Sequence, residues 1–308
     1  MEIRRPEPSS CVGPGGGIRF SPGLEQVPEA MEYCRLLGMG WRPAAGWMAL
    51  SSCCKMCAVP PGGDVAEQDR WPVLRMKVIR KRLADGARGA RGTVVVIDVF
   101  RAFSCTPLFF YFGASKVMLE ADPLRAVELK RFHPDAVLVG EVDEVPIEGG
   151  DMGNSPSRII AEGARRFEGR TVIHRTTAGV TGVSLAAASA DEVILGSFVT
   201  ASAIAEYLKG LQLGEVTLVA MGDRALRPAP EDEACADYLE HLLNGTPYDP
   251  VKVFREVVFQ PTAQKFLTRS RPYLPPEDPL FCLQRDLFDA VPIVAWDGDR
   301  LVVRPPGC

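Results

Sequence analysis

The 308-residue sequence lacks any apolar run long enough to span a membrane. Its most apolar window, residues 103–114, is interrupted by Pro107, whereas a transmembrane helix needs about 20 consecutive apolar residues. A net charge of −4 gives no electrostatic attraction for nucleic acid or for a membrane surface. Nine cysteines occur without regular pairing, and no basic-then-apolar signal segment opens the chain. We therefore expect a cytoplasmic protein with neither a membrane nor a nucleic-acid partner.

Several catalytic and nucleotide-binding motifs are also missing. The sequence has no G-x-x-x-x-G-K-[ST] loop and no G-x-G-x-x-G after a predicted strand, which excludes both standard nucleotide-binding fingerprints. It has no G-x-S-x-G elbow, which argues against an α/β-hydrolase. Asp98 is followed by Val99 and Phe100, so the second aspartate that haloacid-dehalogenase-type phosphatases carry two residues later is absent.

Residues 1–75 differ in composition from the rest of the chain. They contain nine of the 26 prolines, ten of the 29 glycines and five of the nine cysteines. Proline and glycine at this density favour turns or disorder. We therefore predict a low-order extension that is dispensable, for example one added by an over-long start assignment. Cys54 and Cys57 have a C-x-x-C spacing, but without a second ligand pair or a βαβ context we expect inert thiols.

From residue 76 onward the pattern is regular. The stretch TVVVI at 93–97 is an unbroken β-branched run that ends in Asp98, and the strand predicted over 93–99 is typical of a parallel strand that is covered on both faces. Strands alternate with helices, which predicts an α/β domain over residues 76–308 with a mostly parallel sheet and helices on both faces. Segments 291–295 and 301–303 are joined by Asp297-Gly298-Asp299, which predicts a hairpin that adds an antiparallel edge. The other predicted strands are 116–120, 136–139, 171–175, 192–195 and 215–220.

Polar side chains follow most of these strands. Because the carboxyl ends of parallel strands meet at one edge of a sheet, where open α/β sheets bind ligands, we expect these side chains to lie together. Strand ends are also commonly surface turns, and this simpler explanation accounts for about half of them. The polar residues in question are Asp98, Arg101, Glu141, Thr176, Thr177, Ser197 and Asp223.

Two predicted helix starts favour an anionic ligand. At 176–179 and 154–156, backbone N–H groups and the helix dipole form potential anion sites. Two such sites beside several carboxylates indicate a phosphorylated or otherwise anionic ligand with a divalent metal, for which Mg²⁺ is the expected cofactor. The guanidinium groups of Arg101 and Arg175 match a phosphate, sulfonate or carboxylate in a two-pronged way.

Other candidate residues have structural explanations. His174 lies inside a predicted strand, where packing is favoured over acid–base chemistry. Glu231 and Asp232 begin a predicted helix, and acids there stabilise the helix dipole without any catalysis. Cys105 and Cys235 lie on predicted helices, where we expect small apolar packing rather than nucleophilic chemistry.

Five motifs in order resemble the 2-phosphosulfolactate phosphatase (ComB) family. They are VVIDVFRA, GEVDEVPIEGGDMGNSP, HRTTAGVTG, GSFVTASAIA and MGDRALRPAPEDEACADYL, with a looser match in CLQRDLFDAVPIV. The resemblance runs from about residue 94 to about residue 245 and covers none of residues 1–75. It implies a magnesium-dependent phosphatase of unusual α/β fold that converts 2-phospho-3-sulfolactate to sulfolactate, which methanogens carry on to coenzyme M.

Residue pattern and resemblance together give a set of expected roles. We expect the metal to be bound by Asp98, Glu141, Asp151 and Asp223. The expected catalytic residues are Asp98, Arg101, Glu231 and Asp232, with Glu231 or Asp232 taking a proton from a metal-activated water. The residues expected to bind the substrate are Asn154, Ser155, Arg175, Thr176, Thr177, Gly179 and Ser197. Attack by water and a covalent aspartyl phosphate on Asp98 both stay open.

The sequence departs from the family at two places. The family commonly has T-T-N-G-T-R where residues 176–181 are TTAGVT, and a phenylalanine-type residue where Gly150 stands. Both places lie where a second anion of the substrate could bind. The alternatives are therefore a phosphatase for a different small phospho-hydroxy acid and a non-catalytic anion-binding relative. A homo-oligomer is compatible with the sequence.

Overall fold

The computed structural model describes residues 75–305, which lie in the unit formed by residues 74–308. The predicted extension at 1–75 therefore falls, except for its last residue, outside the described residues. The strands are β1 (Lys77–Arg82), β2 (Thr93–Ile97), β3 (Lys116–Leu119), β4 (Val137–Val142), β5 (Val145–Pro146), β6 (Thr171–Arg175), β7 (Glu192–Gly196), β8 (Glu215–Ala220), β9 (Ile293–Asp297) and β10 (Arg300–Val303).

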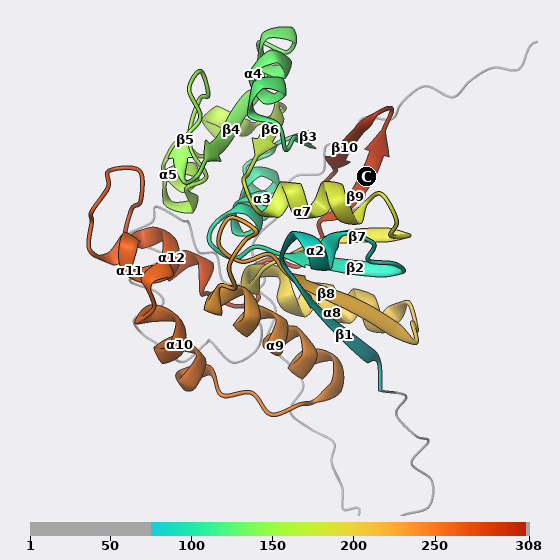
Figure 1. Cartoon of the computed structure of the whole chain (residues 1–308). Helices are drawn as coiled ribbons and strands as arrows, with labels where there is room; N and C mark the ends of the chain where they lie inside the picture. The colour runs from blue at the N-terminus through green and yellow to red at the C-terminus, as the bar shows by residue number, and fades with distance from the viewer. Residues whose placement is uncertain (1–74, 306–308) are drawn as a thin grey trace, which may run out of the picture. The chain divides into compact units, whose positions relative to one another are not determined.

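Helices connect these strands and form most of the segment from residue 230 to 282 (Figure 1). They are α2 (Leu83–Ala87), α3 (Ala102–Tyr111), α4 (Pro123–Phe132), α5 (Pro156–Glu162), α6 (Ala164–Phe167), α7 (Gly179–Ala186), α8 (Ala201–Gly210), α9 (Pro230–Asn244), α10 (Pro250–Val258), α11 (Pro261–Leu267) and α12 (Glu277–Cys282), with a 3₁₀ turn η1 (Phe198–Thr200) before α8. The helix predicted to start at 154–156 ends at Gly163, whose φ of 59° separates α5 from α6.

The ten strands form one mixed sheet in the order β1-β8-β2-β7-β9-β10-β3-β6-β4-β5. The strands β1, β8, β2 and β7 pair in parallel, and so do β3, β6 and β4. The strands β9 and β10 are antiparallel to each other and to their outer neighbours β7 and β3. The strands of one parallel block are therefore antiparallel to the strands of the other.

The predicted α/β fold with a mostly parallel sheet is confirmed, as is the antiparallel hairpin near the C-terminus. The hairpin differs from the prediction in its place, because it joins the two parallel blocks and does not form an edge. Its residues Leu301, Val302 and Val303 are buried and pair with β3. The sides of β3 and β7 that face each other thus gain backbone hydrogen bonds from β10 and β9.

Helices cover both faces of the sheet, as the apolar runs predict. In β2, Val94 and Val96 belong to the core cluster that includes α3 and α7, whereas Val95 and Ile97 belong to the cluster that includes α8 and α9. Because successive side chains of a strand point to opposite faces, both faces of β2 are buried. In the second block, Leu138 and Ile173 pack in a third cluster that includes α4.

The strand β1 is missing from the sequence-based prediction. Its sequence, KVIRKR, is mostly basic and shows no apolar run. It lies at the edge of the sheet beside β8, and Arg80 and Arg82 form ion pairs with Glu233 of α9. Charged side chains are common on edge strands, where they discourage pairing with other chains.

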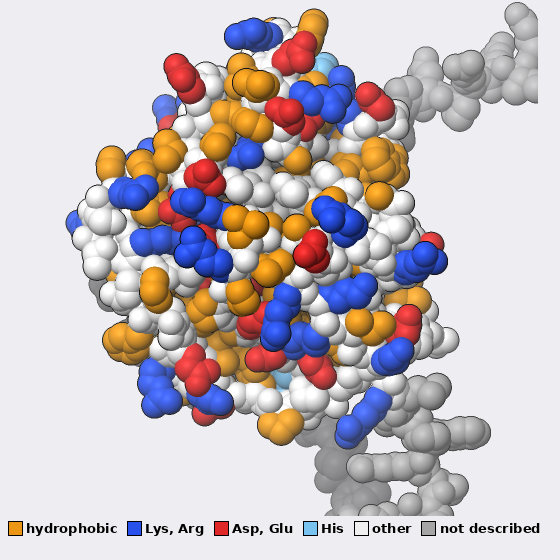
Figure 2. Space-filling model, in the orientation of Figure 1, with side chains coloured by type: hydrophobic (Ala, Val, Ile, Leu, Met, Phe, Trp, Pro, Cys, Tyr) orange, Lys and Arg blue, Asp and Glu red, His pale blue; other side chains and the backbone are white. Residues whose placement is uncertain are grey.

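The surface in Figure 2 carries acidic, basic and hydrophobic side chains interspersed on one face. Among residues 75–305, no helix combines the length and the apolar character needed to cross a membrane.

Candidate active site

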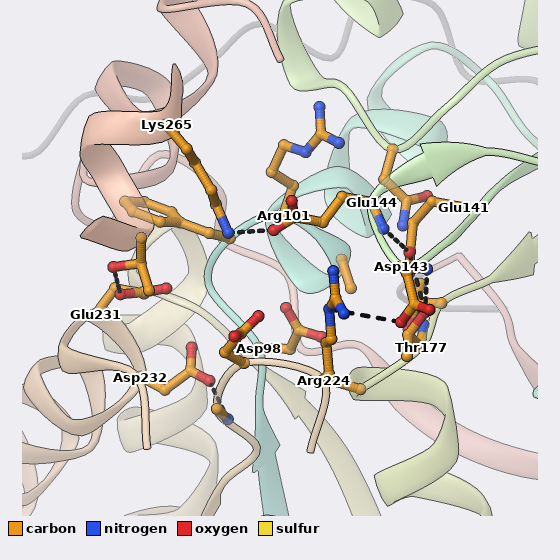
Figure 3. A pocket seen from close by; sticks show the side chains of 18 of the residues that line it. Asp98, Arg101, Glu141, Asp143, Glu144, Thr177, Arg224, Glu231, Asp232 and Lys265 are labelled. Carbon is orange, nitrogen blue, oxygen red and sulfur yellow. Dashed lines mark hydrogen bonds and ion pairs between the residues drawn. The ribbon is translucent and has the colours of Figure 1, made fainter. Parts of the chain in front are cut away.

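A small pocket lies where strands of both parallel blocks end (Figure 3). Asp98 follows β2 and Asp223 follows β8, whereas Glu141 lies in β4 and Thr176 follows β6. The cavity volume is about 60 Å³, which is enough for a few water molecules. The two blocks thus contribute their carboxyl ends to one site although they run in opposite directions.

The structure brings together most of the residues predicted for the site. Those that line the pocket are Asp98, Arg101, Glu141, Asn154, Thr176, Thr177, Asp223, Glu231 and Asp232. Lining residues that the sequence did not single out include Asp143, Glu144, Arg224, Thr262, Lys265 and Phe266. Of these, Arg224 directly follows the predicted Asp223, whereas Lys265 lies on α11 with no local sequence signal.

Asp98 lies against the N-termini of two helices. Backbone N–H groups of Ala102, which begins α3, and of Gly179, which begins α7, interact with its carboxylate. Burial and, next, the Glu141 charge raise the pKa of the Asp98 carboxyl to about 7, while these N–H groups oppose the rise. A carboxyl with a pKa near neutrality can exchange protons or bind a cation under physiological conditions.

Asp232 braces the backbone around the pocket. Its Oδ1 accepts a hydrogen bond from the Val99 N–H at 2.8 Å, and its Oδ2 accepts one from the Gly222 N–H at 2.7 Å. It therefore ties the segments that follow β2 and β8 to the start of α9. Burial and the charge of Asp98 raise the pKa of the Asp232 carboxyl well above its usual range.

Glu231 is buried beside Asp232 at the start of α9. Its Oε2 accepts a hydrogen bond from the Thr262 hydroxyl at 2.8 Å. Burial raises the pKa of the Glu231 carboxyl, and the hydrogen bond from Thr262 opposes this rise. Glu231 is thus a pocket carboxyl with a raised pKa, as carboxyl groups that act as general acids or bases commonly have.

Glu141 is held by the segment that follows β6. Its Oε1 accepts a hydrogen bond from the Thr177 N–H at 2.6 Å, and its Oε2 accepts one from the Thr177 hydroxyl at 3.0 Å. The Glu144 N–H also donates to Oε2 at 2.6 Å. Arg175 supports this arrangement, because its guanidinium donates to the Glu141 carbonyl and to the Thr177 hydroxyl.

Arg101 lines the pocket but is paired with a buried acid that the sequence did not single out. Its Nη1 lies 2.8 Å from Oδ2 of Asp278 in α12 and 3.1 Å from the Tyr273 carbonyl oxygen. Asp278 is fully buried, and its Oδ1 also accepts hydrogen bonds from the Ser155 and Ser157 hydroxyls. The charge of Arg101 is therefore balanced within the protein.

Five predicted residues do not line the pocket. Asp151 accepts a hydrogen bond from the Leu138 N–H and pairs with Lys130 at 2.9 Å, so its placement gives no support to a role as metal ligand. The Ser197 hydroxyl is buried and donates to the Phe103 carbonyl. The others are Ser155, Arg175 and Gly179, whose partners are described above.

Both predicted anion sites hold carboxylates of the protein itself. At the start of α7, the Thr177 N–H donates to Glu141, and the Gly179 N–H interacts with Asp98. At the start of α5, the Ser157 N–H donates to Asp278 at 3.0 Å. The helix dipoles thus stabilise these acids, and substrate binding by the same N–H groups stays a prediction.

His174 is fully buried and packs edge-on against Phe109. Burial lowers the pKa of its imidazole to about 3, so the ring is neutral at physiological pH. Its Nε2 lies 3.1 Å from Oδ1 of Asn154, a distance at which a neutral imidazole N–H can donate. This arrangement orients the Asn154 amide at the pocket wall and supports the packing interpretation of His174.

Carboxylates outnumber cations around the pocket. The acidic lining residues are Asp98, Glu141, Asp143, Glu144, Asp223, Glu231 and Asp232, against the basic residues Arg101, Arg224 and Lys265. Oxygen ligands of this type suit Mg²⁺, which usually keeps several waters and binds through one or two carboxylates. The lining therefore fits Mg²⁺ in its chemistry, although within residues 75–305 no group of three His, Cys, Asp or Glu side chains is already assembled around a metal position.

The fold and the site define an α/β protein whose strand ends enclose an acidic pocket. A family model described as 2-phosphosulpholactate phosphatase matches residues 80–296, which is more than half of the chain. The chain belongs to this family. The family assignment predicted from the sequence motifs is confirmed.

Several curated relatives are similar over most of their own length, and each is named "Probable 2-phosphosulfolactate phosphatase". The relative from Bacillus subtilis is 30% identical over 207 residues, which are 67% of this chain and 88% of the relative. The relative from Carboxydothermus hydrogenoformans is 31% identical over 68% of this chain and 89% of its own. The relative from Thermoplasma volcanium is 27% identical over 68% of this chain and 94% of its own.

Proposed function

We propose that this protein is a phosphatase that hydrolyses 2-phosphosulfolactate to sulfolactate and inorganic phosphate with Mg²⁺ as its cofactor. The observation that carries the proposal is the acidic pocket around Asp98 in a chain that belongs to this family. The names of the relatives support the substrate. The buried, unpaired cysteines Cys105, Cys235 and Cys282 are in keeping with a reducing cytoplasm as its location.

The charge of the pocket supports the need for a divalent cation. The substrate carries a phosphate, a carboxylate and a sulfonate, and the pocket lining is itself net acidic when ionised. Like charges at close range repel strongly in a partly buried site. Asp98, Glu141 and Asp223 would hold Mg²⁺, which when bound polarises phosphoryl oxygens and lowers the pKa of a water.

The residues around Asp98 would then have separate roles in the reaction. Glu231 is the better candidate for the base, because its one side-chain hydrogen bond leaves acceptor capacity, whereas both oxygens of Asp232 already accept backbone N–H groups. In the hydrolysis, a water oxygen bonds to phosphorus as the ester P–O bond breaks. Glu231 takes a proton from this water, and the departing C2 oxygen of sulfolactate takes up a proton from solvent. A covalent phosphate on Asp98 is the alternative route.

Phosphate release from 2-phosphosulfolactate, measured with Mg²⁺ and with EDTA, tests the proposal. We expect activity only with Mg²⁺, and a loss of about 100-fold or more in kcat for Asp98→Asn. Asp85→Asn is the matched control, since the Asp85 side chain is 97% exposed. Absence of phosphate release from this substrate with Mg²⁺ would overturn the proposal. Hydrolysis of a different phosphorylated hydroxy acid in the same assay would favour the alternative substrate.

A further inference from the structure

We propose that Arg224 and Lys265 bind the anionic groups of the substrate other than its phosphate, and that Asp143 and Glu144 hold these two cations until the substrate displaces them. The inference rests on the proposed function, because it names the residues that select a polyanionic phosphate ester. It concerns Asp143 and Glu144, the two residues between β4 and β5, which we call the acidic turn.

The acidic turn places two adjacent carboxylates against two cations that line the pocket. Arg224, in the segment after β8, has its Nε 3.5 Å from Oδ1 of Asp143. Lys265, on α11, donates from its Nζ to Oε1 of Glu144. Figure 3 shows both pairs as dashed contacts that converge on the acidic turn from different elements.

The backbone of the acidic turn is fixed independently of these ion pairs. The Asp143 N–H donates to the Thr177 hydroxyl at 3.1 Å, and the Glu144 N–H donates to Glu141 at 2.6 Å. Both residues have a positive φ, at 51° and 75°. The carboxylates of Asp143 and Glu144 are therefore presented by a turn that keeps its hydrogen bonds when the cations leave.

Each of the two cations can leave its acidic partner and bind a ligand. The side chains of Arg224 and Asp143 are 42% and 55% exposed, and ion pairs of this exposure contribute little to stability. Lys265 and Glu144 are 27% and 24% exposed, so water still reaches both partners. Arg101, the remaining cation of the pocket lining, is buried against Asp278 and is not free to exchange.

The chemistry of the substrate matches this pair of cations. Phosphosulfolactate carries a carboxylate and a sulfonate on adjacent carbons, beside its phosphate. The acidic turn likewise presents two anionic groups from adjacent residues to the same two cations. The turn thus occupies, in the free protein, the positions that the two additional anions of the substrate would take.

Three substrates separate the effects of each anion. Phosphosulfolactate has two additional anions, 2-phospholactate has only the carboxylate, and p-nitrophenyl phosphate has neither. We expect Arg224→Gln and Lys265→Gln each to lower kcat/KM for phosphosulfolactate at least about tenfold more than for p-nitrophenyl phosphate, the loss that one charge-assisted hydrogen bond predicts. The variant that also lowers kcat/KM for 2-phospholactate identifies the cation that binds the carboxylate.

Removal of the competing acids gives a change in the opposite direction. We expect Asp143→Asn and Glu144→Gln to lower KM for phosphosulfolactate, because the cations are released while the hydrogen-bonded turn is kept. A gain of this kind cannot come from structural damage. The matched controls for Arg224→Gln and Lys265→Gln are Arg165→Gln and Lys77→Gln. These remove cations from the exposed pairs with Glu162 and Glu215, away from the pocket.

The outcomes distinguish this inference from the proposed function. Equal losses on phosphosulfolactate and p-nitrophenyl phosphate in Arg224→Gln and Lys265→Gln would overturn the inference, since the cations would then serve the phosphate alone. Hydrolysis of none of the three substrates would overturn the proposed function instead. In that case calorimetric binding of sulfolactate decides: weaker binding by both variants than by the controls supports the inference, and unchanged binding overturns it.

Discussion

Asp98 illustrates how a candidate catalytic residue conflicts with stability. It is 6% exposed and lies among other acids, and burial followed by the Glu141 charge raises the pKa of its carboxyl from 3.8 to about 7. Between about pH 4 and pH 7, the folded protein therefore keeps a proton that the unfolded chain has released. Ionisation of Asp98 lowers the stability of the fold as pH rises through this window.

We predict that Asp98→Asn stabilises the metal-free protein above neutral pH. The cost of ionising Asp98 is on the order of 4 kcal/mol at about pH 8, and it vanishes below about pH 4. The variant should therefore raise the free energy of unfolding by a few kcal/mol at about pH 8 and by much less at about pH 5. Urea unfolding in EDTA at both pH values measures this. A gain that is the same at both would show that Asp98 is not protonated in the folded protein.

At the scale of elements, the start of α7 is shaped by its contact with Asp98. A Cβ atom added at Gly179 would lie 2.7 Å from Oδ2 of Asp98 and 2.9 Å from Cζ of Phe103. Both distances are shorter than real Cβ atoms show. The absence of a side chain at Gly179 lets the first N–H groups of α7 approach the carboxylate.

We predict that Gly179→Ala damages the site more than the helix. The added methyl group should displace Asp98 or Phe103, with a cost of about 1–3 kcal/mol in stability and a loss of at least about tenfold in kcat/KM. Thermal unfolding and phosphate release measure the two effects. Gly210→Ala is the control, because no atom lies within 4 Å of a Cβ at that helix position. Full activity in Gly179→Ala would contradict this account.

The elements that the sequence predicted well are those with a strong local signal. The bounds of β6 and β8 agree with the prediction, because buried apolar runs mark their ends. The position of the β9–β10 hairpin had no such signal, since it depends on which strands lack a partner. The carboxylate at the start of α5 was missed for the same reason, because Asp278 comes from α12, more than 100 residues away in the chain.

The pocket residues likewise divide into those that the sequence could predict and those that it could not. Asp98 and Asp223 could be predicted to lie together, because they follow strands of one parallel block and emerge at its carboxyl end. Glu141 belongs to the other block, and only the folded chain shows that the carboxyl ends of the two blocks meet at one pocket. Lys265 could not be predicted, because its position depends on how α11 packs against the acidic turn. The buried pair of Arg101 and Asp278 was likewise invisible, since only the folded chain brings the two residues together.

At the scale of the molecule, Asp278 connects three distant parts of the chain. Its two carboxylate oxygens bind Arg101 before α3 and the Ser155 and Ser157 hydroxyls at α5. It is fully buried, so its charge has no solvent to stabilise it. The helices after residue 250 are thereby attached to the wall of the pocket.

We predict that Asp278→Asn destabilises the fold by about 3–5 kcal/mol, because it leaves the buried Arg101 charge without its partner. Asparagine keeps an acceptor for the serine hydroxyls, so the change isolates the ion pair. The double variant with Arg101→Met should recover part of the loss. Urea unfolding measures both, with Asp297→Asn, in a partly exposed pair with Lys116, as the control. A loss below about 1 kcal/mol would contradict a structural role for the pair.

The central position of β9 and β10 has a consequence for synthesis of the protein on the ribosome. These strands are the last that the structure describes, yet they join the two parallel blocks. A nascent chain that has not reached residue 293 can pair β1, β8, β2 and β7 with each other, and β3, β6 and β4 with each other, but it cannot join the two sets. The edges of β7 and β3 stay exposed until then, and such edges favour association with other chains. Completion of the sheet, and with it the joining of the two walls of the pocket, must wait until residues 293–303 have been translated.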